Sequence, residues 1–288
     1  MPEPSDVEAA RVDSLAAGDG VWTPPEPRDA ATVCLLRDTD AGPEVFVLRR
    51  NPSMTFAARM YVYPGGAVER SDGDVPTTGR ADDAWLDART ASDRGRAVLV
   101  AAARETFEEC GVLLAVDADG RPATHDDRVE SEREALLRDE LAFADLLADR
   151  GLVVDDAGLV PFAQWLTPEI EDRRFDARFF VAAQPEGQQA RHVGGESDRS
   201  AWWRPVDALA AYAEGRMAMW PPTIATMRFL ARHSSAAEAV AAARAAVVVP
   251  VMPQLVRDDG DSFVVRLVHA RTREFVADAG SHEYGGDA

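Results

Sequence analysis

The sequence predicts an α/β protein in which helices cover a mixed β-sheet. Three observations support this class: a pair of β-rich runs joined by turn residues, a long helical pattern after a double glycine, and later strands mixed with helices. The chain has 288 residues, of which 46% are hydrophobic, so it can bury one large core or two modest ones. The longest apolar run, 97–103, is too short to cross a membrane and is expected in the core.

The first half of the chain contains a leader, a hairpin and a sharp turn. Residues 1–28 are acidic and proline-rich, and we expect a flexible leader without regular structure. Residues 31–36 and 44–48 are β-rich and flank the turn formers at 38–43, which predicts a hairpin. A short strand at 61–63 then meets the break Pro64-Gly65-Gly66.

Helical patterns dominate the remainder. The segment 70–93 is polar, with a short helix expected near Trp85 and Leu86, and Arg94–Cys110 is a helix that Gly111 should end. Further helices are expected within 127–150, 206–215 and 222–246, a strand over 178–183, and a β-prone tail over 247–276. We therefore expect a leader at 1–28, a domain at 29–246 with an insertion at about 70–93, and a C-terminal extension at 247–288.

The charged residues exclude several classes of function. All 31 Lys and Arg residues are arginine, so a phosphate-binding loop ending in Gly-Lys-Ser/Thr, a lysine Schiff base and a kinase strand lysine are impossible. The formal net charge of -19 makes binding to a nucleic-acid backbone unfavourable. Cys34 and Cys110 form no C-x-x-C pair and are expected to be buried free thiols. The N-terminus lacks a secretory signal, and we expect a cytoplasmic protein without a membrane span.

The chemically informative run begins at Arg104. On a helix, Glu105 lies three and four positions before Glu108 and Glu109, so the three carboxylates can share one face. Such carboxylates repel one another, and a hard divalent cation such as Mg²⁺ or Mn²⁺ would relieve the repulsion. Arg104 can pair with one carboxylate and orient it. The alternative interpretation is a solvated acidic helix face.

The run resembles the second half of the Nudix box, Gly-x5-Glu-x7-Arg-Glu-U-x-Glu-Glu-x-Gly-U, where U is a bulky aliphatic residue. Gly66 matches the opening glycine and Glu69 matches an acidic residue often found three positions later. The resemblance implies a Nudix-type α/β/α sandwich around a mixed β-sheet. Arg104 lies 38 positions after Gly66, where the unbroken motif has 14, so about two dozen residues are inserted and the first glutamate of the box is left unassigned.

An insertion at this place resembles the coenzyme A diphosphatases of the peroxisomal type and their bacterial relatives. Residues 30–232 carry further landmarks of that branch, among them Arg50-Asn51-Pro52, Trp165-Leu166-Thr167-Pro168 and Pro221-Pro222-Thr223. The stricter entry signature of other coenzyme A-cleaving Nudix enzymes is not met, because Arg59 stands where a glycine is expected.

The resemblance implies hydrolysis of a diphosphate bond with Mg²⁺ or Mn²⁺ as the cofactor. Glu108 and Glu109 would bind the metal, together with the carbonyl of Gly66. Glu105 would be a further ligand or the general base, Arg104 would orient the carboxylates, and Glu69 is a further ligand candidate.

Several residues outside the box are weaker candidates. Glu196, in a Gly-rich loop, could supply an extra ligand or base, or could be an ordinary turn residue. Arg49, Arg50 and Arg59 could bind substrate phosphates, or could be surface arginines beside strands. The tryptophans could stack on an adenine ring, although a core position is the commoner role; they are Trp165, Trp202, Trp203 and Trp220. His192 is expected to be an ordinary loop histidine.

The expected partner is therefore a small nucleotide-derived substrate, with coenzyme A or acyl-coenzyme A preferred. NADH, ADP-ribose, another dinucleotide or a capped RNA end are alternatives, and nucleic acid is disfavoured by charge. A Nudix-fold sensor that binds a nucleotide without cleaving it, and a scaffold protein with an acidic surface helix, are alternatives of other classes. A homodimer is suggested only because Nudix proteins commonly dimerise.

Overall fold

A mixed sheet of ten strands organises the residues that the computed structural model describes, which are 4–52, 59–92, 94–191, 197–257 and 262–278. The strand order is β12-β11-β10-β7-β8-β1-β2-β3, with β4 paired to β1 and β9 to β2. The strands are β1 Arg28–Thr39, β2 Gly42–Arg50, β3 Tyr61–Val62, β4 Gly65–Ala67, β7 Val160–Leu166, β8 Phe175–Ala183, β9 Ser197–Trp203, β10 Pro250–Arg257, β11 Phe263–His269 and β12 Phe275–Asp278, and β5 Ala115–Val116 pairs separately with β6 Val153–Val154.

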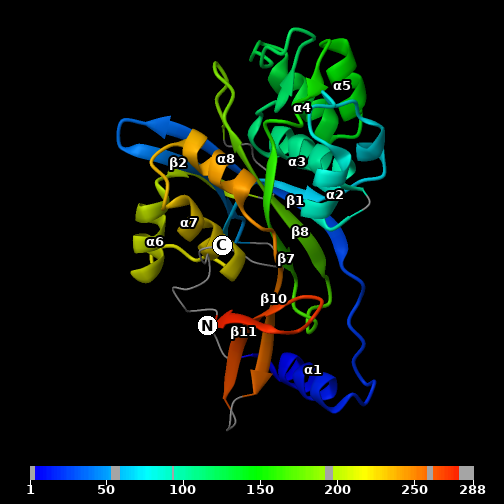
Figure 1. Cartoon of the computed structure of the whole chain (residues 1–288), viewed down its shortest axis with the longest axis vertical. Coiled ribbons are helices and arrows are strands. Elements are labelled where there is room, and N and C mark those ends of the chain that lie inside the picture. Colours follow the sequence, from blue (N-terminus) through cyan, green and yellow to red (C-terminus); the bar gives the residue numbers. More distant parts are fainter. Residues whose placement is uncertain (1–3, 53–58, 93, 192–196, 258–261, 279–288) are drawn as a thin grey trace.

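Helices lie on both sides of this sheet. They are α1 Asp6–Ala17, α2 Asp83–Thr90, α3 Gly95–Cys110, α4 Val129–Leu137, α5 Phe143–Asp149, α6 Pro205–Ala213, α7 Pro221–Leu230 and α8 Ala236–Ala245, with the short 3₁₀ helix η1 at Ser71–Asp74. In Figure 1, α2 to α5 gather on one side of the sheet and α6 to α8 on the other. The predicted α/β/α sandwich around a mixed sheet is confirmed.

The alternation of side chains along β1 explains why both faces are covered. Val33 and Leu35 belong to the core under α3, whereas Cys34 and Leu36 belong to the core under α7 and α8. Successive residues of a strand point to opposite faces, so a central strand with two apolar faces requires a layer on each side. The apolar run 97–103 is buried throughout, as predicted. Both cysteines are free and buried, also as predicted.

The hairpin and the double glycine lie as the sequence predicts. β1 pairs antiparallel with β2, with Leu36 opposite Val45 and Thr39 opposite Gly42. After β3, the chain returns along the other part of β1, and Gly66 lies opposite Ala31. This pairing places the double glycine beside α3, which contacts both β1 and β4.

Two predicted helical regions are each divided into two helices. Residues 127–150 form α4 and α5, and residues 222–246 form α7 and α8. Ser235 separates the second pair because its hydroxyl accepts the backbone N–H of Glu238 at 3.2 Å and caps α8. The short helix expected near Trp85 is α2, and the long helix expected over Arg94–Cys110 is α3.

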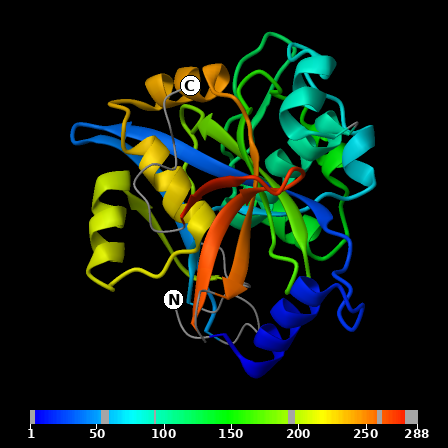
Figure 2. The same cartoon turned by 60° about the horizontal axis from the view of Figure 1, so that its bottom comes forward.

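The expectation of an irregular leader is wrong for Asp6–Ala17, which forms α1. Ser5 and Glu8 make a capping box, with Ser5 Oγ 3.3 Å from the Glu8 nitrogen and Glu8 Oε2 2.7 Å from the Ser5 nitrogen. Arg11 fastens the helix by donating to the carbonyl of Ile170 at 2.6 Å. The acidic, proline-rich composition of the leader concealed this local signal. Figure 2 shows α1 beside the end of β10, with which it is in contact.

The β-prone tail is confirmed as β10, β11 and β12, which extend the sheet beyond β7. β10 runs parallel to β7, with Val251 opposite Trp165, and β11 returns antiparallel to it. Within the residues described, no helix combines the length and the apolar character that crossing a bilayer requires.

Candidate metal and diphosphate site

The last two turns of α3 carry the three predicted carboxylates. Glu105 and Glu108 are largely covered, with side chains 14% and 18% exposed. α3 ends directly after Glu109 and Cys110 because Gly111 adopts a left-handed φ of 73° and its N–H donates to the carbonyl of Phe107 at 2.8 Å. The carboxylates therefore lie at the end of a helix whose other face is locked into the core.

Arg104 holds two of these carboxylates. Its Nη1 donates to Glu105 Oε1 at 2.8 Å and to Glu108 Oε1 at 3.1 Å, and its Nη2 donates to the carbonyl of Ala67 at 2.9 Å. The residue is 5% exposed. Burial alone would lower the pKa of Arg104, but its bond to Asp72 and the charges of Glu105 and Asp72 raise it above the ordinary arginine value. Arg104 is therefore always charged and orients its neighbours.

Asp72 is a residue that the sequence analysis missed. Its Oδ1 accepts Nε of Arg104 at 2.9 Å and its Oδ2 accepts Nη2 at 3.2 Å, and the residue is 1% exposed. Oδ2 also accepts the backbone N–H of Glu69 at 2.7 Å. Asp72 is the seventh residue counted from Gly66, which is the place of the unassigned glutamate of the Nudix box. Counting forward from Gly66, rather than backward from Arg104, would have found it.

The double glycine lies against the carboxylates. The backbone N–H of Gly65 donates to Glu109 Oε2 at 2.8 Å. A Cβ atom on Gly66 would lie 2.5 Å from Cδ and Oε1 of Glu105, closer than any real contact of a Cβ. Only glycine therefore lets β4 approach the Glu105 carboxylate this closely.

The electrostatics of the cluster suit a hard cation. Burial raises the pKa of Glu105 to about 7, Arg104 opposes this effect, and the charge of Glu108 adds to it. Burial also raises the pKa of Glu108. A divalent cation would favour the charged forms of these oxygen ligands, so the donor chemistry fits Mg²⁺ or Mn²⁺.

No three His, Cys, Asp or Glu side chains form a ready metal-binding group within the ranges that the structure describes. Arg104 and the Gly65 N–H hold the carboxylates instead. Glu69 is more open, with a side chain that is 60% exposed and an oxygen 3.9 Å from Nη1 of Arg104.

The predicted phosphate-binding arginines lie on β2 and just before β3. Arg49 is engaged by Asp198 of β9, with Nε 2.8 Å from Oδ1. The backbone N–H of Arg59 donates to the carbonyl of Arg50 at 3.0 Å, and Arg59 has a φ of 63°. That left-handed conformation explains why a glycine is expected at this position in the related signature. Glu196 and His192 lie outside the described residues.

Two of the tryptophans have structural partners. Trp165 is 3% exposed and lies in the core. The Trp202 ring packs edge-on against Phe46 at 5.2 Å between centroids, and the Arg37 guanidinium lies 4.3 Å from its centre. The burial of Trp165 and the ring contacts of Trp202 favour a packing role for both.

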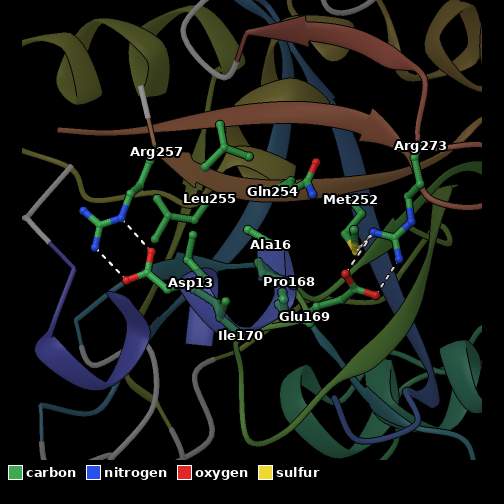
Figure 3. Close-up of a pocket in the computed structure, with 13 residues that line it drawn as sticks. Asp13, Ala16, Pro168, Glu169, Ile170, Met252, Gln254, Leu255, Arg257 and Arg273 are labelled. Carbon is green, nitrogen blue, oxygen red and sulfur yellow. Dashed lines mark hydrogen bonds and ion pairs between the residues drawn. The ribbon is translucent and has the colours of Figure 1, made fainter. Parts of the chain in front are cut away.

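A separate cavity of about 410 Å³ lies between α1, the 168–170 loop and β10. Figure 3 shows an ion pair at each end, Asp13 with Arg257 and Glu169 with Arg273. None of the predicted site residues lines it. The cavity is thus distinct from the carboxylate cluster.

A mixed sheet between helical layers, with a glycine turn against helix-borne glutamates and their arginine, defines a Nudix-type protein. The family model of the NUDT19 Nudix domain matches residues 81–230, which is just over half of the chain. The chain belongs to the Nudix hydrolase family and resembles its coenzyme A diphosphatase branch.

Two relatives share the name acyl-coenzyme A diphosphatase NUDT19. The Xenopus laevis protein is 26% identical over 217 residues, which are 62% of this chain and 57% of the relative. The Homo sapiens protein is 25% identical over 272 residues, which are 81% of this chain and 71% of the relative. This chain thus spans less than two thirds of the length of the Xenopus relative.

A crystal structure of a NUDIX hydrolase from Alicyclobacillus acidocaldarius is similar throughout its length. It superposes with a TM-score of 0.64 at 29% identity, covering 75% of this chain and 96% of that one. The overall fold of this chain is therefore shared with that protein over three quarters of this chain's length.

Proposed function

We propose that this protein is a divalent-metal-dependent hydrolase that cleaves the diphosphate bond of a nucleoside diphosphate linked to another moiety, with coenzyme A or acyl-coenzyme A as its substrate. The observation that carries the proposal is the gathering of Glu105, Glu108 and Glu109 beside Gly65 and Gly66. The names of the two vertebrate relatives, both acyl-coenzyme A diphosphatases, support the choice of substrate.

The residues of the cluster have different proposed roles in metal binding and in orienting the ligands. Glu105, Glu108 and Glu109, with the carbonyl of Gly66, would hold Mg²⁺ or Mn²⁺, and Glu69 is a further candidate. A bound divalent ion neutralises diphosphate oxygens and lowers the pKa of a coordinated water. Arg104 keeps the carboxylates of Glu105 and Glu108 in one orientation through its bonds to both.

Glu105 is also the candidate general base. A base works best when its pKa lies near the working pH, and burial raises the pKa of Glu105 to about 7. Its carboxylate is held 2.8 Å from Arg104 and faces the Gly66 backbone, so it can accept a proton at a fixed position. Glu196 remains a second candidate for a ligand or base, and Arg49, Arg50 and Arg59 remain candidates for binding the substrate phosphates.

A substrate panel tests the proposal. The full chain is incubated with Mg²⁺ or Mn²⁺ and with coenzyme A, acetyl-coenzyme A, NADH, ADP-ribose and a dinucleoside polyphosphate, and mass spectrometry identifies the products. We expect an adenosine 3′,5′-bisphosphate and a 4′-phosphopantetheine product from coenzyme A. Faster cleavage of NADH or ADP-ribose would show that this compound, and not coenzyme A, is the preferred substrate. Tight binding without cleavage would favour the non-catalytic sensor.

The variant Glu109→Gln tests whether the activity found with the substrate panel depends on the carboxylate cluster. The variant should lose most turnover of the best substrate and should retain the thermal unfolding profile of the unmodified chain. Turnover at the original rate would show that the chemistry lies elsewhere.

A further inference from the structure

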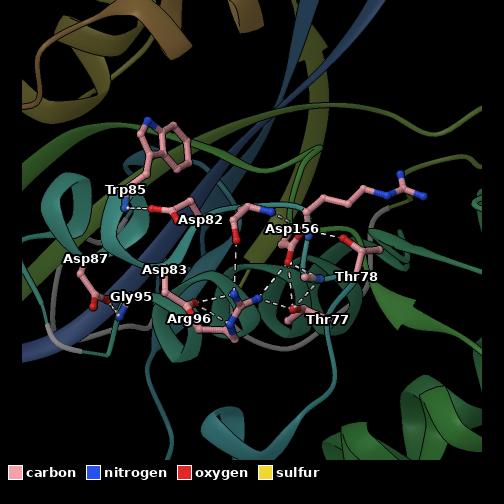
Figure 4. Close-up of polar contacts among 12 residues, drawn as sticks. Thr77, Thr78, Asp82, Asp83, Trp85, Asp87, Gly95, Arg96 and Asp156 are labelled. Carbon is pink, nitrogen blue, oxygen red and sulfur yellow. Dashed lines mark hydrogen bonds and ion pairs between the residues drawn. The ribbon is translucent and has the colours of Figure 1, made fainter.

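Asp156, just after β6, accepts hydrogen bonds from the inserted segment and from α3. Its side chain is fully buried. It accepts six hydrogen bonds, shown in Figure 4: from the hydroxyls of Thr77 and Thr78, the backbone N–H groups of Gly79, Arg80 and Ala81, and Nη1 of Arg96. A buried carboxylate is tolerated only when its oxygens are satisfied, so this coordination fixes residues 77–81 in one conformation.

The same segment is joined to the first turn of α3. Arg96 of α3 reaches Asp156 at 2.8 Å and also donates from Nε to Asp83 at 2.9 Å. The backbone N–H of Gly95 donates to Asp87 Oδ1 at 3.0 Å, and a Cβ on Gly95 would lie 2.6 Å from that oxygen. The start of α3 is therefore in close contact with the insertion.

Upstream of residues 77–81, the chain meets α3 again two turns later along that helix. Asp72 binds Arg104 there, and only residues 73–76 separate it from the segment that Asp156 holds. These residues have little freedom, because Val75 is 5% exposed and the carbonyl of Pro76 accepts the Val154 N–H at 3.1 Å. A displacement of residues 77–81 would thus be transmitted to Asp72.

We propose that Asp156 is a positioning residue for the carboxylate cluster. By fixing residues 77–81 against α3, it sets the place at which Asp72 meets Arg104, and Arg104 in turn orients Glu105 and Glu108. The metal-binding consequence rests on the proposed function, whereas the mechanical coupling from Asp156 to Asp72 does not.

The first test measures Mn²⁺ affinity of the full chain by electron paramagnetic resonance of the free ion. Asp156→Asn should weaken Mn²⁺ binding by about 3-fold or more, less than the ~10- to 100-fold typical for a direct partner of a metal ligand, because Asp156 acts through Asp72 and Arg104. The matched control is Asp155→Asn, whose carboxylate accepts, among the residues described, only a local backbone N–H from Ala157; it should change the affinity less than 2-fold. Thr77→Val should resemble Asp156→Asn, and Thr77→Ser, which keeps the hydroxyl, should restore binding.

A double-mutant cycle separates positioning from general destabilisation. In an Asp72→Asn background, Asp156→Asn should have little further effect on Mn²⁺ affinity, because the pathway is already broken. Losses of affinity that multiply independently would overturn the proposal.

Hydrogen–deuterium exchange tests the mechanical coupling between Asp156 and Asp72 without metal or substrate. Asp156→Asn should speed exchange of peptides 69–75 and 104–109 and leave α6 and α7 unchanged. Unchanged exchange at 69–75, or equal acceleration in α6 and α7, would refute the positioning role. If the unmodified chain binds no Mn²⁺, the proposed metal-dependent function is refuted. The positioning role of Asp156 is then tested by the exchange data alone.

Discussion

Asp72 and Arg104 lie 32 positions apart in the sequence and form a buried two-point contact, with Nε to Oδ1 at 2.9 Å and Nη2 to Oδ2 at 3.2 Å. This contact joins the first half of the Nudix box to the second half across the inserted residues. Paired donors on a planar guanidinium fix direction as well as distance, so the pair controls how Arg104 presents its remaining N–H groups to Glu105 and Glu108.

Asp72→Asn should damage both the pair and the cluster. An amide offers one acceptor oxygen where the carboxylate offers two, and the buried Arg104 loses its strongest side-chain hydrogen bond and one of its counter-charges. We expect a loss of roughly 2–4 kcal/mol in unfolding free energy and a 10- to 100-fold fall in turnover. Urea unfolding and steady-state kinetics measure the two effects. Asp74→Asn, in the same 3₁₀ helix but exposed, is the control and should leave both near their original values.

Gly66→Ala should separate activity from stability. The added Cβ would lie 2.5 Å from the carboxylate of Glu105, which must turn away. Because the obstructing group is the end of a flexible side chain, unfolding free energy should change by less than about 1 kcal/mol, while turnover should fall at least about 10-fold. Gly73→Ala, where a Cβ would meet nothing within 4 Å, is the control. A Gly66→Ala variant of full activity would show that Glu105 need not approach this backbone.

Local patterns predicted the parts of the site that lie within one element. The apolar run before Arg104 and the glycine at 111 were enough to place α3, and with it the common face of Glu105, Glu108 and Glu109. The hairpin and the glycine turn followed from equally short stretches. Such signals depend on neighbours a few residues away, which the sequence displays directly.

Contacts across the insertion could not be predicted in this way. Asp156 meets Thr77 79 positions away and Asp72 meets Arg104 32 positions away, and acidic residues are so common here that composition singles out neither. α1 was missed for a different reason. Its capping box was visible at Ser5 and Glu8, but the composition of the leader outweighed it.

Glu105→Gln should stabilise the metal-free protein at alkaline pH. Burial, and to a smaller extent the charge of Glu108, raise the pKa of Glu105 from 4.5 in the unfolded chain to about 7 in the folded protein. Between these values the folded state binds the proton more tightly, so the stability that this group contributes is present below pH 4.5 and is lost as pH rises to about 7. Glutamine stays neutral and avoids this loss.

Thermal unfolding with a chelator present measures the effect. The advantage of Glu105→Gln over the unmodified chain should be at least about 1 kcal/mol larger at pH 8 than at pH 5. Added Mn²⁺ should stabilise the unmodified chain more than the variant, because only the former keeps the third carboxylate. The control is Glu134→Gln on α4, whose side chain is 53% exposed. An advantage that does not depend on pH would contradict the raised pKa of Glu105.

Arg89→Leu should destabilise the fold without touching the carboxylate cluster. From α2, Arg89 donates to the carbonyl of Pro161 in β7 at 2.7 and 2.9 Å, and to the carbonyls of Ala243 and Ala246 at 2.6 Å each. The last two carbonyls lie at the end of α8, where a cation is favourable. Leucine would leave three acceptors unsatisfied, at a cost of about 2–4 kcal/mol in unfolding free energy. Arg121→Leu, whose side chain is 72% exposed, should cost less than about 0.5 kcal/mol. Denaturant unfolding of the two variants, with turnover measured well below the melting temperature, tests this role, and equal stabilities would refute it.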